Sequence, residues 1–482
     1  MKFTLDEIRT AMGLPVSATN ESSLPLRIIT DSREAGPATI FWALCGESQD
    51  GHAFVESALS AGCDAAVISP PCPLSSGERG PEGRVRGQLL EVSDTLAALQ
   101  SLATWNRQRH ATKVVGITGS FGKTTTREMI HSALQYEIPS HRSPRNFNNH
   151  FGVPLTLLGL TAHHKAAIVE LGASVHGEVR RLSEIASPQI GIITGIGQSH
   201  RATFGDASEV AKAKGELAES LPADGLLLLC GDDAHSASIA SRSSARVALI
   251  GTTNECHVQA EAIHLEGERL CVRIDGTEFR IRAAGRHFAR SVLLAVATAR
   301  EFGLTDQQIA TGLANFQAPV GRCSVETIGS WTVIDDSYNS SPEAFAAACG
   351  LLGEWPAEAR QILVCGDMLE LGEAASVCHQ DAGLTIARAG IDRVFAMGDF
   401  SRDVVESALG SGLDPNYGEA FGKNEMPSLL HRLQQTLKSG DVILVKGSRG
   451  MRMERVIEWL RSEALAADQI VVPQIETIPG LE

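Results

Sequence analysis

The stretch that decides the fold runs from residue 114 to residue 126 and reads Val114-Val115-Gly116-Ile117-Thr118-Gly119-Ser120-Phe121-Gly122-Lys123-Thr124-Thr125-Thr126. An apolar run typical of a strand is followed by a turn with glycines and then by a helical pattern. In such an arrangement, backbone N–H groups of the turn and of the helix N-terminus bind phosphate oxygens. Lys123 would add a point charge, and the Thr124 hydroxyl would reach a phosphate-bound Mg²⁺. We therefore predict a nucleoside triphosphate site that is formed by Gly119, Ser120, Phe121, Gly122, Lys123, Thr124 and Thr125.

This loop departs from the usual phosphate-binding pattern at one position. Ile117 stands where that pattern has glycine, and the nearest glycines are Gly116 and Gly119. The order of strand, turn and helix still predicts a phosphate site. The loop by itself does not identify a reaction.

The length and composition of the chain limit its class. At about 150 residues per domain, 482 residues predict three domains. A net charge of −15 argues against nucleic acid as a partner and against binding to an anionic membrane. No stretch approaches the roughly 18 apolar residues of a membrane span, and the N-terminus lacks a signal-peptide core. We expect a cytoplasmic protein whose ten scattered cysteines are reduced.

Strand-like and helix-like stretches alternate along most of the chain, which predicts an α/β protein with parallel sheets. We expect a small α/β domain over residues 1–110 and a central phosphate-loop domain over 111–317. A C-terminal, Rossmann-like domain is expected over 318–482. At the end of the central domain, the stretches 258–265, 270–274 and 278–281 alternate in polarity and predict antiparallel hairpin strands.

Polar side chains follow several strands of the central segment. Glu170 closes one predicted strand, and His200 follows another, so both are candidates for holding Mg²⁺ at the carboxyl edge of the sheet. The alternatives are a surface or capping carboxylate and a structural histidine. Asn148 and Asn149 either bridge phosphates and sugars or form a turn. Lys214 lies in a helical stretch, where a solvated lysine is the ordinary interpretation.

The third segment has its own candidates. Arg322 either reaches phosphate from the domain boundary or forms a surface ion pair. Asp336 follows Asp335 at a strand end, and adjacent strand residues point to opposite faces, so only one of them can face a crevice. Lys446, Ser448 and Arg449 follow another strand and suit a carboxylate or a phosphate.

These motifs occur in the order found in the Mur ligases, and the chain resembles that family over essentially its whole length. The resemblance is carried by the phosphate loop with Thr124-Thr125-Thr126, Asn148-Asn149, Glu170-Leu171-Gly172, His200, Ala213-Lys214-Gly215-Glu216, Gly321-Arg322, Asp335 to Asn339, Gly366 to Gly372 and Lys446 to Arg449, together with Asp31-Ser32-Arg33 and Asp50-Gly51-His52. The stretches Gly366 to Gly372 and Lys446 to Arg449 resemble most the branch that adds a dipeptide.

The resemblance implies an ATP- and Mg²⁺-dependent amide ligase of peptidoglycan precursor synthesis. Such an enzyme joins D-alanyl-D-alanine to UDP-N-acetylmuramoyl-tripeptide through an acyl phosphate. Catalysis would then depend on Lys123, Glu170, His200 and Lys214. Magnesium would be held by Thr124, Glu170, His200 and a carbamylated Lys214, while Arg322 and Asp336 would contact ATP. Substrate contacts would come from Ser32, Arg33, Asn148, Asn149, Lys446, Ser448 and Arg449.

The chain also departs from the family pattern, most clearly at His287-Phe288-Ala289-Arg290-Ser291, where relatives have His-Asn-x-x-Asn. An asparagine there is expected to contact adenine. Two alternatives therefore stay open. One is another amide ligase of the superfamily, such as the ligase that adds the third residue or a folylpolyglutamate synthase. The other is a nucleotide-binding relative with impaired catalysis. Nothing in the sequence indicates an obligate partner chain, so we expect a monomer.

Overall fold

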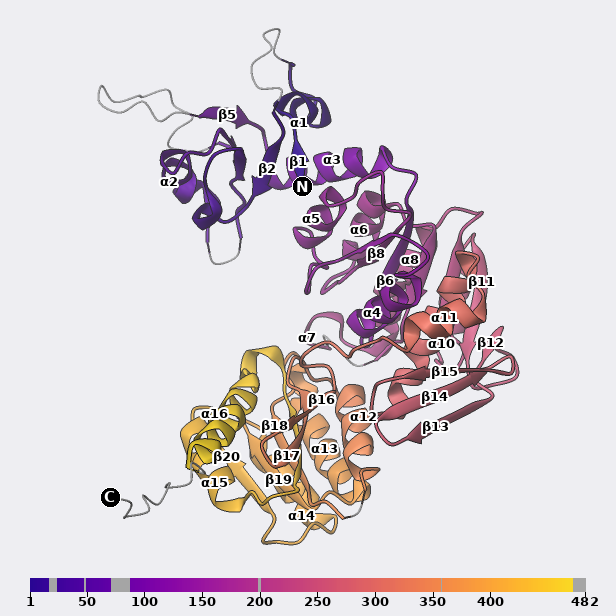
Figure 1. Cartoon of the computed structure of the whole chain (residues 1–482), viewed down its shortest axis with the longest axis vertical. Helices are drawn as coiled ribbons and strands as arrows, with labels where there is room; N and C mark the ends of the chain where they lie inside the picture. Colours follow the sequence, from indigo (N-terminus) through magenta and orange to yellow (C-terminus); the bar gives the residue numbers. More distant parts are fainter. Residues whose placement is uncertain (17–23, 47–48, 71–86, 198–200, 357, 471–482) are drawn as a thin grey trace, which may run out of the picture.

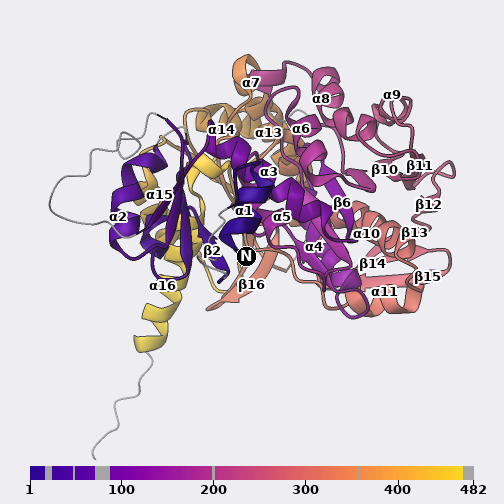
Figure 2. The same ribbon diagram turned by 90° about the horizontal axis from the view of Figure 1, so that it is seen from above.

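The computed structural model describes residues 1–16, 24–46, 49–70, 87–197, 201–356 and 358–470. Three α/β units follow one another along the chain, with the N-terminal unit beside the central one and the C-terminal unit below it in Figure 1. Figure 2 shows the same arrangement from above. No helix within the described ranges combines the length and the apolar composition that crossing a membrane requires.

The first unit is built on a five-stranded sheet in the order β1-β2-β3-β4-β5. The pair β1–β2 is antiparallel and the other pairs are parallel. Its last helix, α3, packs against the central unit, because Asn106 Nδ2 donates to Leu157 O at 2.9 Å and Arg107 Nε donates to Ala186 O at 3.0 Å. The elements are β1 (Lys2–Phe3), α1 (Leu5–Ala11), β2 (Leu26–Ile29), β3 (Thr39–Trp42), α2 (Val55–Ser60), β4 (Ala65–Ile68), β5 (Gln88–Glu91) and α3 (Thr95–Gln108), with 3-10 turns at Ser32–Glu34 and Gly51–Phe54.

The central unit has a seven-stranded sheet in the order β12-β11-β10-β9-β6-β8-β7, and all its pairs are parallel. Its strands are nearly all apolar, as expected for a sheet that helices cover on both faces. The elements are β6 (Lys113–Thr118), α4 (Lys123–Leu134), β7 (Ser140–Arg142), α5 (Gly152–Leu158), β8 (Ala166–Glu170), α6 (Glu178–Ala186), β9 (Ile190–Ile193), α7 (Arg201–Phe204), α8 (Ala207–Glu219), β10 (Leu226–Cys230), α9 (Ser236–Ala240), β11 (Arg246–Gly251), β12 (Val258–Gln259), α10 (Ala289–Glu301) and α11 (Asp306–Leu313), with a 3-10 turn at Arg286–Phe288.

A small antiparallel sheet follows in the order β13-β14-β15, formed by β13 (Ala262–Glu266), β14 (Arg269–Ile274) and β15 (Thr277–Ile281). The prediction of one hairpin strand over 258–265 was wrong in part. Its first residues form β12, which pairs in parallel with β11 and extends the large sheet. The strand breaks at residues 260–261, and only β13 pairs in antiparallel fashion.

The third unit has a six-stranded sheet in the order β16-β17-β21-β18-β19-β20, in which only the edge pair β16–β17 is antiparallel. This edge strand was not predicted. The elements are β16 (Ser324–Ile328), β17 (Trp331–Asp336), α12 (Pro342–Gly353), β18 (Gln361–Gly366), α13 (Ala375–Ala389), β19 (Arg393–Met397), α14 (Ser401–Gly410), β20 (Gly418–Phe421), α15 (Met426–Thr436), β21 (Val442–Lys446) and α16 (Glu454–Ile470), with 3-10 turns at Gly372–Ala374 and Arg449–Met451.

The position of β6 determines where a ligand can bind in the central unit. The chain leaves β6 toward β7 and β8 on one side and later returns to β9 on the other side. At such a switch point the two connections diverge and leave a crevice at the carboxyl ends of the strands. Ile117 is paired with both Glu170 and Ile192, so the ends of β8 and β9 flank the phosphate loop.

Candidate active site

The phosphate loop has a backbone that depends on glycine. Gly119 has a φ of +138°, and a Cβ there would lie 2.2 Å from Thr194 Oγ1. Gly122 is left-handed, with a φ of +77°, and forms the N-cap of α4. A side chain at Gly119 would therefore collide with Thr194 and Gly195, which follow β9, whereas at Gly122 the difficulty is conformational. These glycines leave the N-terminus of α4 open toward a ligand.

The residues after β9 anchor the loop. Ser120 N donates to Gly195 O at 2.9 Å, and Gly197 N donates to Ser120 Oγ at 2.9 Å. Within the loop, Lys123 Nζ donates to Gly119 O at 2.6 Å. The loop is thus fixed by neighbouring backbone, which limits the reorganisation that phosphate binding requires.

A cleft of about 400 Å³ separates the phosphate loop from the third domain. It brings together many of the predicted residues, because both domains present strand ends and helix starts to it. The central domain lines it with Ser120, Phe121, Gly122, Lys123, Thr124, Thr125, Asn146, Asn148 and Glu170. The third domain lines it with Arg322, Tyr338, Asn339, Ser340, Ser341, Ala344, Leu369, Glu370, Leu371, Ser448, Arg449 and Gly450.

Glu170 has a buried carboxylate at the wall of this cleft. Its Oε1 lies 2.7 Å from a guanidinium nitrogen of Arg127, an ion pair without an aligned hydrogen bond, and Asn148 Nδ2 lies 3.5 Å from Oε2. A carboxylate can accept about four hydrogen bonds or metal contacts. The remaining capacity of Glu170, beside the Thr124 hydroxyl, therefore fits a divalent cation with oxygen ligands.

Sequence reasoning did not single out Arg127. One signal was available, because Arg127 lies four residues after Lys123 and therefore on the same face of α4. It is almost fully buried and contacts Glu128 at 2.6 Å as well as Glu170. Arg127 therefore holds the Glu170 carboxylate in place beside the loop.

The pKa values of two lysines are lowered. Burial reduces the pKa of Lys123 to about 8, with a further reduction from Arg322 and an opposing effect from Glu170. Burial likewise reduces the pKa of Lys214 to about 7, assisted by the charge of Lys123. Lys214 Nζ donates to Ala173 O at 2.8 Å and lies 5.6 Å from the Phe204 ring. Burial thus favours the neutral amine form of Lys214.

Two residues predicted to contact ligands are bound to each other in the third domain. Lys446 Nζ lies 2.5 Å from Asp336 Oδ2 and donates to Asn339 O at 3.1 Å. The register of β17 on β21 places Asp336 opposite Lys446. Neither lines the cleft, whereas Ser448 does, with its Oγ accepting from Leu369 N at 2.8 Å. The Lys446–Asp336 ion pair therefore lies behind the residues that line the cleft and stabilises their position.

Lys446→Met is expected to lower the thermal unfolding midpoint strongly, because it leaves the buried Asp336 carboxylate without its cation. Only 1% of the Lys446 side chain and 10% of the Asp336 side chain are exposed, and breaking such a pair costs about 3–5 kcal/mol. The double variant Lys446→Met, Asp336→Asn should recover much of the loss, as calorimetry can measure. A single variant as stable as the parent would contradict this account.

Other predicted residues lie elsewhere. Asn149 Oδ1 accepts from Phe151 N and Gly152 N, so its side chain stabilises the turn before α5, which was its alternative interpretation. Ser32 and Arg33 follow β2 in the first domain, where Arg33 is 89% exposed and paired with Asp31. No first-domain residue among those described lines the cleft. His200 lies outside the described residues.

A second cavity of about 420 Å³ lies on the other side of the loop and shares Phe121 and Gly122 with the cleft. Ile250, Ile263 and Leu293 supply apolar surface, which suits a flat base beside the phosphates. The divergent stretch lies here, because His287, Ala289, Arg290 and Ser291 all line this cavity. The guanidinium of Arg290 lies 5.3 Å from the Phe121 ring and donates to Thr194 O at 3.2 Å.

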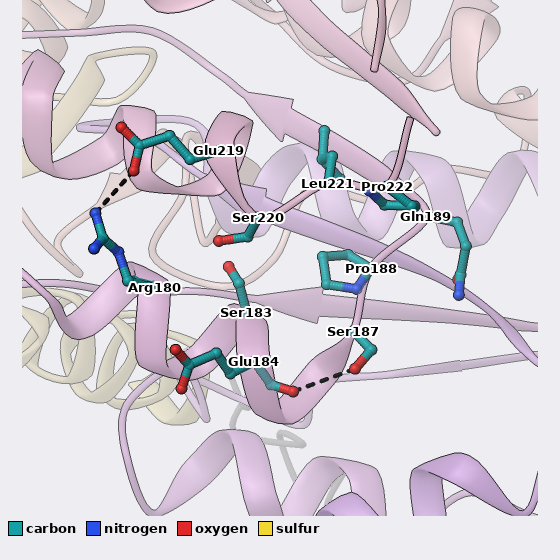
Figure 3. Close-up of a pocket in the computed structure, with 10 residues that line it drawn as sticks. All are labelled: Arg180, Ser183, Glu184, Ser187, Pro188, Gln189, Glu219, Ser220, Leu221 and Pro222. Carbon is teal, nitrogen blue, oxygen red and sulfur yellow. Dashed lines mark hydrogen bonds and ion pairs between the residues drawn. The ribbon is translucent and has the colours of Figure 1, made fainter. Parts of the chain in front are cut away.

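A further cavity, of about 660 Å³, lies away from this site (Figure 3). It is lined by Pro188 and Gln189, which precede β9, and by Leu221 and Pro222, which precede β10. It therefore opens at the amino edge of the sheet, opposite the crevice. Figure 3 shows Arg180 paired with Glu219 across its wall, at 2.8 Å.

A glycine-dependent phosphate loop, a buried carboxylate and cations from a separate Rossmann-like domain define a multidomain nucleotide-dependent enzyme. Comparison with known proteins agrees: residues 117–299 match the Mur ligase middle domain, and residues 321–449 match the Mur ligase glutamate ligase domain. The chain belongs to the Mur ligase family.

Several relatives are similar over almost their whole length. UDP-N-acetylmuramoyl-tripeptide--D-alanyl-D-alanine ligase of Bacillus subtilis is 34% identical over 91% of this chain and 94% of the relative. The protein of the same name from Synechocystis is 34% identical over 96% of this chain and 98% of the relative. The crystal structure of MurF from Acinetobacter baumannii matches with a TM-score of 0.83 at 30% identity, covering 96% of this chain and 99% of that one.

Proposed function

We propose that this protein is an ATP-dependent amide ligase that joins D-alanyl-D-alanine to UDP-N-acetylmuramoyl-tripeptide and releases ADP and phosphate. The observation that carries the proposal is the cleft in which the phosphate loop and Glu170 face Arg322, Ser448 and Arg449 of the third domain. Full-length similarity to ligases of that name supports the choice of substrates.

The reaction has two steps. The terminal carboxylate of the tripeptide attacks the γ-phosphorus of ATP, and the bond to the leaving ADP oxygen breaks, which gives an acyl phosphate. The amine of the dipeptide then attacks the acyl carbon, loses a proton and displaces phosphate. Carboxylate and triphosphate repel each other, so the chain must supply positive charge where they meet. Lys123, the loop N–H groups and Arg322 supply it from two domains.

Magnesium fits the same wall of the cleft. Thr124 and Glu170 offer a hydroxyl and a buried carboxylate, and we propose His200 and a carbamylated Lys214 as the further ligands. When bound, Mg²⁺ would neutralise phosphate charge. Carbamylation needs a neutral amine, which the lowered pKa of Lys214 provides. It converts a buried cation into a group that resembles a carboxylate.

The remaining residues have supporting roles in this proposal. Asp336 would contribute indirectly to the ATP-facing side of the third domain, through its ion pair with Lys446. The peptide substrates would be positioned by Asn148, Asn149, Ser448 and Arg449. Ser32 and Arg33 would bind the uridine end in the first domain. We further propose that the enzyme works as a monomer in the cytoplasm.

A phosphate-release assay with purified protein, ATP, Mg²⁺, the UDP-linked tripeptide and D-alanyl-D-alanine tests the function. We expect release only with the complete set. Two other substrate sets test the sister activities. One contains a UDP-linked dipeptide with diaminopimelate or lysine as the amine, and the other contains a folate with glutamate as the amine. ATP binding without phosphate release from any set would instead indicate the catalytically impaired relative and would overturn the ligase assignment.

A further inference from the structure

A cavity of about 380 Å³ adjoins the reaction cleft and is lined by four arginines. We call it the arginine pocket; its guanidinium-bearing residues are Arg127, Arg145, Arg322 and Arg449. It shares five lining residues with the reaction cleft, namely Thr124, Asn146, Arg322, Tyr338 and Arg449. No acidic residue is among the described residues that line it. Four cations around one cavity are unexpected in a chain with a net charge of −15.

The four guanidinium groups are neutralised unequally. Arg127 is paired with Glu128 and Glu170, and Arg449 lies 3.2 Å from Glu454. Among the described residues, Arg145 and Arg322 have no carboxylate within 4.0 Å. Arg322 stacks on the Tyr338 ring at 4.2 Å, and Arg449 lies 5.6 Å from the same ring. Tyr338 therefore orients two cations without removing their charge.

The backbone at Arg145 is in an unfavourable conformation. Its φ is +49°, in the left-handed region that disfavours residues with a Cβ. Its carbonyl oxygen accepts from an Arg127 guanidinium nitrogen at 2.6 Å, which ties the turn to α4. An exposed arginine in such a conformation beside a cleft suggests a role for its side chain.

We propose that the arginine pocket binds a second peptide carboxylate, one that is not activated in the reaction. The proposal rests on the proposed function, because only peptide substrates bring such a group. The phosphates are already served by the loop, Lys123 and the shared Arg322, whereas a planar carboxylate matches the other guanidinium groups in a bidentate manner. Its source is either the C-terminal carboxylate of the accepted dipeptide or a side-chain carboxylate of the third tripeptide residue. Both lie within about two residues' reach, roughly 7 Å, of the bond being formed.

Arg145→Gly tests the proposal, because glycine removes the guanidinium and suits the left-handed backbone. We expect KM for the substrate that fills the pocket to rise about tenfold, with KM for ATP unchanged. Arg452→Gly is the matched control: Arg452 is also exposed, has a φ of +54° and lines neither cavity. It should leave every constant unchanged.

Two substrate pairs distinguish the sources. If the dipeptide carboxylate is bound, Arg145→Gly raises KM for D-alanyl-D-alanine but not for its C-terminal amide. If the third residue is bound, the variant raises KM for the diaminopimelate tripeptide but not for the lysine tripeptide. Equal effects on charged and uncharged members of both pairs, no effect on either peptide, or a rise in KM for ATP alone would overturn the proposal. Absence of phosphate release by the unmodified enzyme would instead refute the proposed function.

Discussion

Lys123→Met abolishes ligation, with kcat/KM expected to fall at least about a thousandfold. Lys123 is the cation of the phosphate loop, and its Nζ lies against the loop backbone at Gly119 O. The methionine side chain fills similar space without charge, so the γ-phosphate would meet the attacking carboxylate without its nearest cation. Steady-state phosphate release measures the loss.

Lys165→Met provides the matched control for this substitution. It removes the same charge from the same domain, but Lys165 is exposed and precedes β8 at the opposite edge of the sheet. We expect activity within about twofold of the parent, because exposed charges at that distance are largely screened. Retention of more than a tenth of the activity by Lys123→Met would refute the role given to Lys123.

Lys214→Ala is expected to reduce kcat by at least about a hundredfold, with partial recovery in the presence of a short carboxylic acid. The reason is the proposed carbamate, since the added acid would replace a carboxylate-like group in the space that alanine leaves. Labelled bicarbonate should give a ¹³C carbamate signal in the parent protein and none in the variant.

Lys212→Ala is the control, because Lys212 lies on the same helix, α8, but is exposed and paired with Glu209 at 2.6 Å. That variant should keep both the carbamate signal and the activity. Full activity of Lys214→Ala, or a parent protein without the ¹³C signal under turnover conditions, would rule out the carbamate.

Local patterns were enough to predict the phosphate loop and the ends of the central strands. Glu170 could be placed at the cleft because a strand end in a parallel sheet faces the crevice. Arg127 could have been found by its helical spacing from Lys123. Asn149 was ambiguous, because stabilising a turn and binding a ligand need the same amide.

Contacts between distant parts of the chain could not be predicted in this way. Lys446 and Asp336 are 110 residues apart and meet only through the register of β17 and β21. The carbonyl partner of Lys214, Ala173, lies 41 residues away. The edge strand β16 forms by pairing with β17, and Val258–Gln259 joins the large sheet by pairing with β11. The periodicity of polar and apolar residues does not predict which strands pair.

The left-handed backbone of Arg145 has a consequence for protein engineering. Glycine at this position would stabilise the folded protein by roughly 1–2 kcal/mol, because it removes the unfavourable backbone conformation. It would also destabilise the folded protein by about 0.4–1 kcal/mol, because the unfolded chain becomes more flexible. A selection for thermostability alone would therefore favour Arg145→Gly, the same change that is expected to weaken substrate capture. Stability and turnover would thus select opposite residues at position 145.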